Sequence, residues 1–91
     1  MGHYTLRRLS DGAGDSGGES LALWLEGDEV RQEHNARPRV GVKLRVGSSY
    51  ARSYQSQDWW LTNFITRIVE DAPGRVVFET ESGSNYVWTV R

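Results

Sequence analysis

The sequence predicts a mainly β fold: a small antiparallel barrel or strongly bent sheet of about five strands. Two observations predict it. The C-terminal third alternates segments rich in β-branched and aromatic residues with turn-type residues, a composition that suits pleated strands. Upstream, residues 39–46 alternate apolar side chains with basic or small ones, as a strand with one buried face does. With 91 residues, of which 37% are hydrophobic, we expect a single small β-domain over residues 1–91 with one modest core.

The C-terminal segment predicts a three-strand antiparallel meander. Its strands are expected at residues 62–70, 75–80 and 85–90. Pro73 and Gly74 mark the first turn, and a cluster with Gly and Ser marks the second. Alternation assigns the inward faces. The residues expected to face inward from the last two strands are Val76, Phe78, Thr80, Tyr86, Trp88 and Val90.

The first strand of the meander has no clean alternation. Phe64 and Ile68 share one parity, whereas Ile65 and Val69 share the other. Either both faces of this strand are partly covered, or a bulge near Thr66 and Arg67 shifts the register. We favour partial cover on both faces, as in a small barrel or sandwich.

Residues 39–46 form the clearest alternating segment. One face would carry four apolar residues, and the other a row of basic residues. The apolar residues are Val40, Val42, Leu44 and Val46, and the basic ones are Arg39, Lys43 and Arg45. Together with the meander, this predicts one buried cluster that contains Val42, Leu44, Phe78 and Trp88.

The N-terminal part is less regular. Residues 4–9 predict a strand, and the glycines and acidic residues of 11–19 predict a flexible loop. Residues 20–26 fit strand alternation, and we favour a strand that pairs back on residues 4–9; they also fit a helical stripe. Residues 28–38 are polar and predict an exposed connection or a helical turn, so a short helix within 20–36 is the alternative.

Residues 47–60 have the composition of a binding loop. Tyr, Trp and Arg lie among Ser, Gln and Gly, and these large side chains are frequent in binding hot spots. We expect Trp59 or its neighbour Trp60 to be buried, because adjacent strand residues face opposite ways. The residues predicted to contact a partner are Tyr50, Arg52, Tyr54 and Trp59.

The alternative partner is a nucleic acid. The basic strand face of Arg39, Lys43 and Arg45 would contact phosphates, and the neighbouring aromatics would stack on bases. The net charge of −1 gives this alternative no further support.

The sequence does not predict an enzyme. It contains no HExxH, GxSxG or CxxC motif, and His3 and His34 have no second ligand or base nearby in sequence. The chain has no cysteine, and we expect neither a metal nor a cofactor. No apolar run approaches the roughly 20 residues of a membrane helix, and no signal peptide is evident. The expected compartment is therefore the cytoplasm, and no membrane partner is expected.

Residues 62–90 carry a resemblance. The segments TNFITRI, VVFET and SNYVW are similar to a theme in small uncharacterised bacterial and phage β-domains, over about a third of the chain. The resemblance implies a non-enzymatic binding protein of a mobile element. In its small size and lack of motifs the chain also resembles anti-CRISPR proteins, which implies an inhibitor of a host protein or nucleoprotein complex. A barrel of this size would be SH3-like or OB-like.

Overall fold

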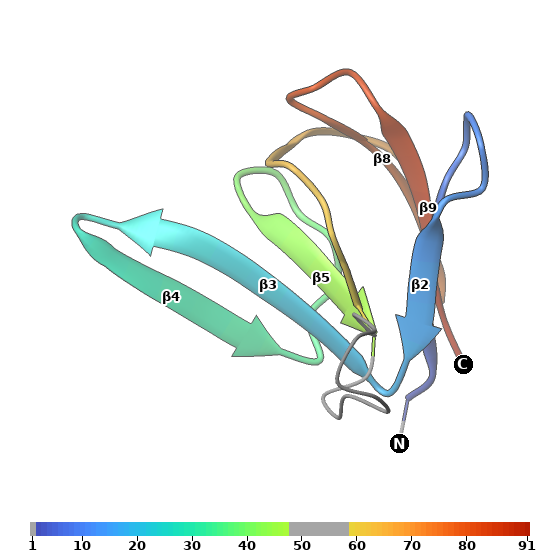
Figure 1. The fold of residues 1–91 in the computed structure, drawn as a ribbon, viewed down its shortest axis with the longest axis horizontal. Helices are drawn as coiled ribbons and strands as arrows, with labels where there is room; N and C mark the ends of the chain where they lie inside the picture. Colours follow the sequence, from blue (N-terminus) through green and yellow to red (C-terminus); the bar gives the residue numbers. More distant parts are fainter. Residues whose placement is uncertain (1, 48–58) are drawn as a thin grey trace, which may run out of the picture.

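The computed structural model describes residues 2–47 and 59–91, which form nine strands in two antiparallel sheets (Figure 1). The first sheet has the order β2-β1-β9-β8-β7 and the second the order β4-β3-β5-β6. The strands are β1 (Tyr4–Arg8), β2 (Gly14–Gly17), β3 (Glu19–Glu26), β4 (Glu29–His34), β5 (Lys43–Gly47), β6 (Trp59–Leu61), β7 (Ile65–Ala72), β8 (Arg75–Thr80) and β9 (Asn85–Val90).

The mainly β prediction is confirmed, but the predicted strand number of about five is wrong. The described residues contain no helix, so the alternative of a short helix within 20–36 is also wrong. In this part of the chain, accordingly, no helix has the length and apolar character to cross a bilayer. The two strand orders do not close into a barrel.

The core lies between the two sheets. Buried residues of β1, β8 and β9 pack with those of β3 and β5 in one cluster. Each of the four residues predicted for the core is buried in it, which confirms that prediction: Val42, Leu44, Phe78 and Trp88. Beyond this core, the hairpin of β3 and β4 extends away from the first sheet (Figure 1).

The C-terminal meander is confirmed, since β8 pairs with β7 on one side and β9 on the other. The first strand begins at Ile65 rather than at residue 62. Its register shifts at Thr66 and again at Val69, which leaves Ile65 buried, Ile68 packed on the core and Val69 exposed. The bulge interpretation is therefore right, and the favoured interpretation of cover on both faces is wrong.

The segment 39–46 is a strand only from Lys43 onward. Pro38 and Gly41, whose φ is +96°, keep the preceding residues out of the sheet. The Gly41 N–H instead donates to the Ile65 carbonyl at 2.9 Å, which joins this segment to the first sheet. Val42, Leu44 and Val46 are buried as predicted, whereas Val40 is 58% exposed.

The predicted flexible loop 11–19 contains a strand. Residues 14–17 form β2, which pairs with β1 along its whole length. A Cβ at Gly14 would lie 1.9 Å from the Leu6 carbonyl oxygen. This glycine therefore provides room for the neighbouring backbone rather than flexibility.

The predicted pairing of residues 20–26 with residues 4–9 is also wrong. That segment is β3, which pairs with β4 on one side and β5 on the other, while β1 pairs with β2 and β9. The polar segment 28–38, interpreted as a connection or a helical turn, contains β4. The polar composition did not indicate a strand because all six residues of β4 are exposed, so this strand has no buried apolar face.

Candidate functional site

The second sheet has apolar side chains on both faces. Ala22, Leu44 and Val46 point into the core. Because directly opposite residues of antiparallel strands share a face, the pairs Leu25–Val30 and Leu23–Lys43 must lie on the other side. This side, the outer face, has no sheet packed against it in the described structure.

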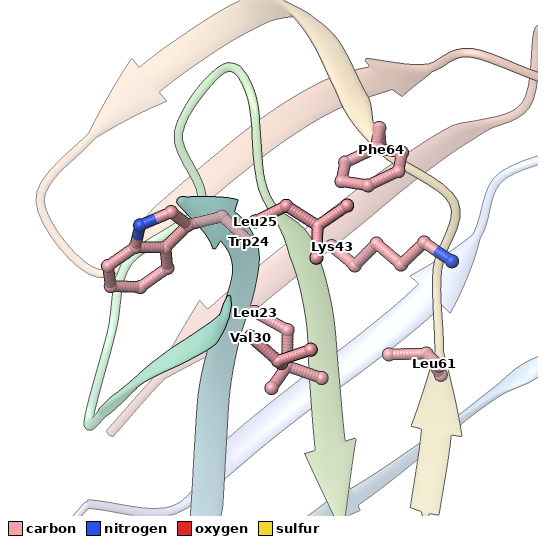
Figure 2. A pocket seen from close by; sticks show the side chains of 7 residues that line it. All are labelled: Leu23, Trp24, Leu25, Val30, Lys43, Leu61 and Phe64. Atoms are coloured by element: carbon pink, nitrogen blue, oxygen red, sulfur yellow. The ribbon is translucent and has the colours of Figure 1, made fainter. Parts of the chain in front are cut away.

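The outer face holds a hollow of about 340 Å³ (Figure 2). Its lining residues are Leu23, Trp24, Leu25, Val30, Lys43, Leu61 and Phe64. Figure 2 shows the indole of Trp24 pointing away from the other six side chains, so Trp24 borders the hollow without filling it. The volume falls within the range of about 300–1,000 Å³ that is common for ligand sites.

Three of the lining residues are exposed. Leu25, Val30 and Leu61 expose 63%, 71% and 38% of their surfaces. Leu23 and Phe64 are half-buried beside them. Single exposed apolar residues are common, but a contiguous group around one hollow is typical of an interaction site.

Among the described residues that line the hollow, Lys43 is the only charged one. Its Nζ lies 5.0 Å from the centroid of the Phe64 ring, within the range of a cation–π contact. No carboxylate of the described residues forms an ion pair with it. Lys43 is also the one lysine of the sequence. The hollow can therefore accept an apolar group that carries a negative charge near its edge.

The predicted partner-binding residues divide into two groups. Tyr50, Arg52 and Tyr54 lie outside the described residues. Trp59 is the first residue of β6 and pairs with Gly47, on the same outer face as Leu61. Its neighbour Trp60 packs against the core, but both tryptophans are only half-buried, so the expectation that one of them is buried is met in part.

The basic residues of the nucleic-acid alternative do not form one face. Lys43 and Arg45 lie on the outer face, but Arg39 precedes the strand and lies 4.7 Å above the Trp24 ring. Arg39 and Arg45 both contact other side chains of this chain. Arg45 pairs with Glu19 at 2.5 Å and stands 5.5 Å from the Trp59 ring centroid. Arg39 also pairs with Glu33 at 3.2 Å.

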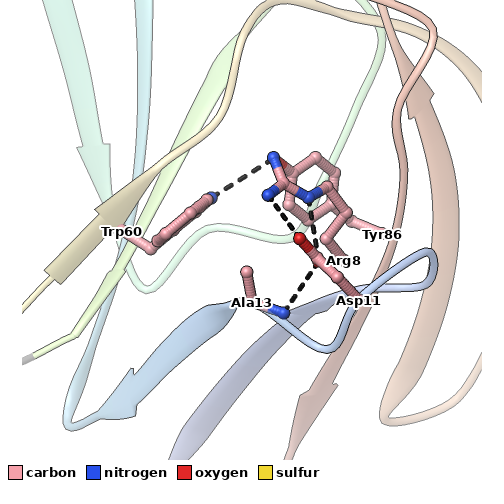
Figure 3. A network of polar contacts seen from close by, with 5 residues as sticks. All are labelled: Arg8, Asp11, Ala13, Trp60 and Tyr86. Carbon is pink, nitrogen blue, oxygen red and sulfur yellow. Dashed lines mark hydrogen bonds and ion pairs between the residues drawn. The ribbon is translucent and has the colours of Figure 1, made fainter.

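A network of polar contacts joins the turn after β1 to both sheets (Figure 3). Arg8 donates two hydrogen bonds to the Asp11 carboxylate, at 3.0 and 2.7 Å, and its guanidinium lies 5.3 Å from the Trp60 ring centroid. The Trp60 Nε1 donates to the Tyr86 hydroxyl at 3.2 Å. The hydrogen bond from Arg8, and after it the one from the Ala13 N–H, lowers the pKa of Asp11 to about 2. The hydrogen bond to Asp11 in turn raises the pKa of Arg8.

This network fastens the turn, and none of its residues lines the hollow of the outer face. Residues 2–47 and 59–91 contain no group of three His, Asp or Glu side chains arranged to hold a metal ion. The outer face is therefore the feature of the described chain with the geometry of a binding site.

The sequence contained a signal for this site that the prediction missed. Gly27 and Asp28 separate two extended segments, and a Gly-Asp pair is typical of a two-residue hairpin turn with Gly first. The structure has a positive φ at Gly27, +63°. Recognising this hairpin would have placed Val30 opposite Leu25 on one face of the sheet.

Comparison with known proteins adds no assignment: no family model, curated protein or solved structure matches the chain.

Proposed function

We propose that this chain is a non-enzymatic protein-binding module, and that its partner docks on the outer face of the second sheet. The observation that carries the proposal is the exposure of Leu25, Val30 and Leu61 around one hollow. Burying apolar surface contributes about 25 cal/mol per Å². Covering these side chains therefore provides a driving force for association.

The side chains of the outer face indicate which groups the partner would present to it. An apolar side chain would enter the hollow between Leu25 and Leu61, and a carboxylate beside it would meet the ammonium of Lys43. Trp59 extends the same face along β6. Tryptophan is among the residue types most frequent in binding hot spots.

Protein is favoured over nucleic acid as the partner because of how the cations are held. Arg39 and Arg45 are each engaged by a carboxylate and an aromatic ring of this chain. Phosphate binding by Arg45 would require its partly buried contact with Glu19 to be broken, whereas apolar docking leaves that contact in place. The expectation of a phage or mobile-element inhibitor of a host complex, such as an anti-CRISPR protein, stays a prediction about the partner's identity.

The test compares four baits in a lysate of the source cell. Leu25→Glu and Val30→Glu each place a charge on the outer face, while Leu9→Glu places one at a residue that is 56% exposed elsewhere. We expect wild type and Leu9→Glu to capture the same protein, and both outer-face variants to lose it, since a hot-spot residue contributes about 2 kcal/mol or more. Nuclease treatment and added salt should leave this capture intact.

Lys43 offers an independent measurement, because an amine-reactive acetylating reagent can modify no other side-chain amine of this sequence. The bound partner should protect Lys43 from acetylation, as read by mass spectrometry. Equal capture by all four baits, or recovery of nucleic acid alone, would contradict the proposal. A variant with Tyr50, Arg52 and Tyr54 replaced by alanine tests in the same assay whether the binding loop predicted from composition contributes to capture of the partner.

A further inference from the structure

We infer that a second copy of this chain pairs with it through β4, edge to edge and antiparallel, so that two second sheets form one continuous sheet. The inference concerns a different surface from the proposed docking face and does not rest on it. Strand edges expose unpaired backbone N–H and C=O groups, which another strand can satisfy.

Among the edge strands of the two sheets, β4 is the one suited to such pairing. β7 is interrupted by two register shifts, and bulges protect edges from pairing. β2 has four residues and β6 has three. β4 has six residues in unbroken register with β3, all of them exposed, and its hairpin stands clear of the first sheet (Figure 1).

The turn of the hairpin determines which backbone groups of β4 are free. Gly27 and Asp28 form a two-residue turn, so Glu26 and Glu29 form the hydrogen-bonded pair beside it. Hydrogen-bonded pairs alternate along an antiparallel ladder. The N–H and C=O groups of Glu29, Arg31 and Glu33 therefore point to β3, and those of Val30, Gln32 and His34 point to the open edge.

The charges of β4 select the register. A two-fold axis at Gln32, perpendicular to the sheet, places Arg31 of each copy opposite Glu33 of the other and forms two opposite-charge pairs. An axis at Arg31 or at Glu33 would instead place like charges opposite each other at that residue. Cross-strand pairs of opposite charge stabilise a pair of strands, whereas like charges directly opposite each other destabilise it.

The same axis keeps both outer faces on one side of the joined sheet, because directly opposite residues point to the same face. Arg31 lies 3.1 Å from Glu29 of its own hairpin, and Glu33 lies 3.2 Å from Arg39. All four of these side chains are at least 43% exposed. Arg31 and Glu33 can therefore turn toward the second copy at small cost. The outcome is a symmetric dimer with both hollows on the same side of the joined sheet.

The test is the oligomeric state of the purified chain over a range of concentrations, by sedimentation equilibrium. Wild type should form a reversible dimer. Gln32→Pro should be monomeric yet folded, because Pro removes an N–H that points away from β3. Arg31→Glu and Glu33→Arg should each weaken dimerisation by roughly tenfold or more, since 1.4 kcal/mol corresponds to a factor of ten.

Mixing the two charge variants gives the sharpest result. Each variant alone brings like charges together, whereas an equimolar mixture restores opposite charges at both positions and should form a heterodimer. Arg67→Glu on β7 is the matched control and should dimerise as wild type does. A monomeric wild type at all concentrations, a dimer unaffected by Gln32→Pro, or a mixture that stays monomeric would overturn the inference.

Discussion

The Nε1 of Trp88 donates a hydrogen bond to the hydroxyl oxygen of Ser20 at 3.0 Å, across the core and between the two sheets. The Ser20 hydroxyl in turn donates to the Ala36 carbonyl at 2.8 Å. Both side chains are fully buried. One hydroxyl thus satisfies a polar group of β9 and another of the segment after β4, both inside the core.

Ser20→Ala should therefore lower the free energy of unfolding by about 1–3 kcal/mol, because it leaves the Trp88 N–H buried without an acceptor. Urea denaturation followed by tryptophan fluorescence measures the effect. Ser10→Ala is the matched control, since Ser10 is exposed, and its stability should equal that of wild type. Equal stability of Ser20→Ala and wild type would show that this hydrogen bond contributes little.

Phe78→Ala should cost about 3–5 kcal/mol, the usual cost of truncating a buried aromatic side chain. Phe78 is fully buried and stacks on Tyr86, with 5.5 Å between ring centroids. That loss approaches the total stability of a small domain, about 5 kcal/mol at the low end. Thermal denaturation should find the variant largely unfolded at moderate temperature, while Val69→Ala at an exposed residue should melt as wild type does.

Gly14→Ala should disrupt the pairing of β1 with β2, because the added Cβ would meet the Leu6 carbonyl oxygen at 1.9 Å. Gly18→Ala is the matched control, since a Cβ there meets no atom within 4 Å. Amide hydrogen exchange of residues 4–7 and 14–17 should speed up in the first variant only. If the two variants show the same protection, the predicted flexible loop describes this segment better than a strand does.

Asp11→Asn should reveal a stabilising contribution that disappears in acid. The folded pKa of Asp11, about 2, lies below its ordinary value of 3.8. The unfolded chain therefore takes up the proton first, so the contribution is complete above the ordinary value and is lost as the pH falls through about 2. Urea denaturation should find wild type more stable than Asp11→Asn at neutral pH, with a difference that shrinks between about pH 4 and 2.

The control for this pH effect is Asp28→Asn, at the exposed turn of the β3–β4 hairpin, where no ion pair with described residues exists. A stability difference between wild type and Asp11→Asn that does not change over this pH range would contradict the assignment. Direct titration of the Asp11 carboxyl by NMR provides a second measurement.

The sequence by itself determined the β class, the meander and much of the core. Val76, Phe78, Tyr86 and Trp88 are buried because they alternate along strands whose turns are marked by Pro, Gly and Ser. Such information is local: period-two alternation and turn chemistry act over a few residues and need no knowledge of the rest of the chain.

Tertiary structure alone decided which strands far apart in sequence become neighbours and which faces stay open. β1 pairs with β9 across most of the chain length, and nothing local to residues 4–8 specifies that choice. Leu23 and Leu25 have strand-type alternation that predicts a buried face, but the second sheet meets the core with Ala22 and leaves Leu25 and Val30 in solvent. An apolar residue is buried only where another element covers it, and that cover depends on contacts between segments far apart in sequence.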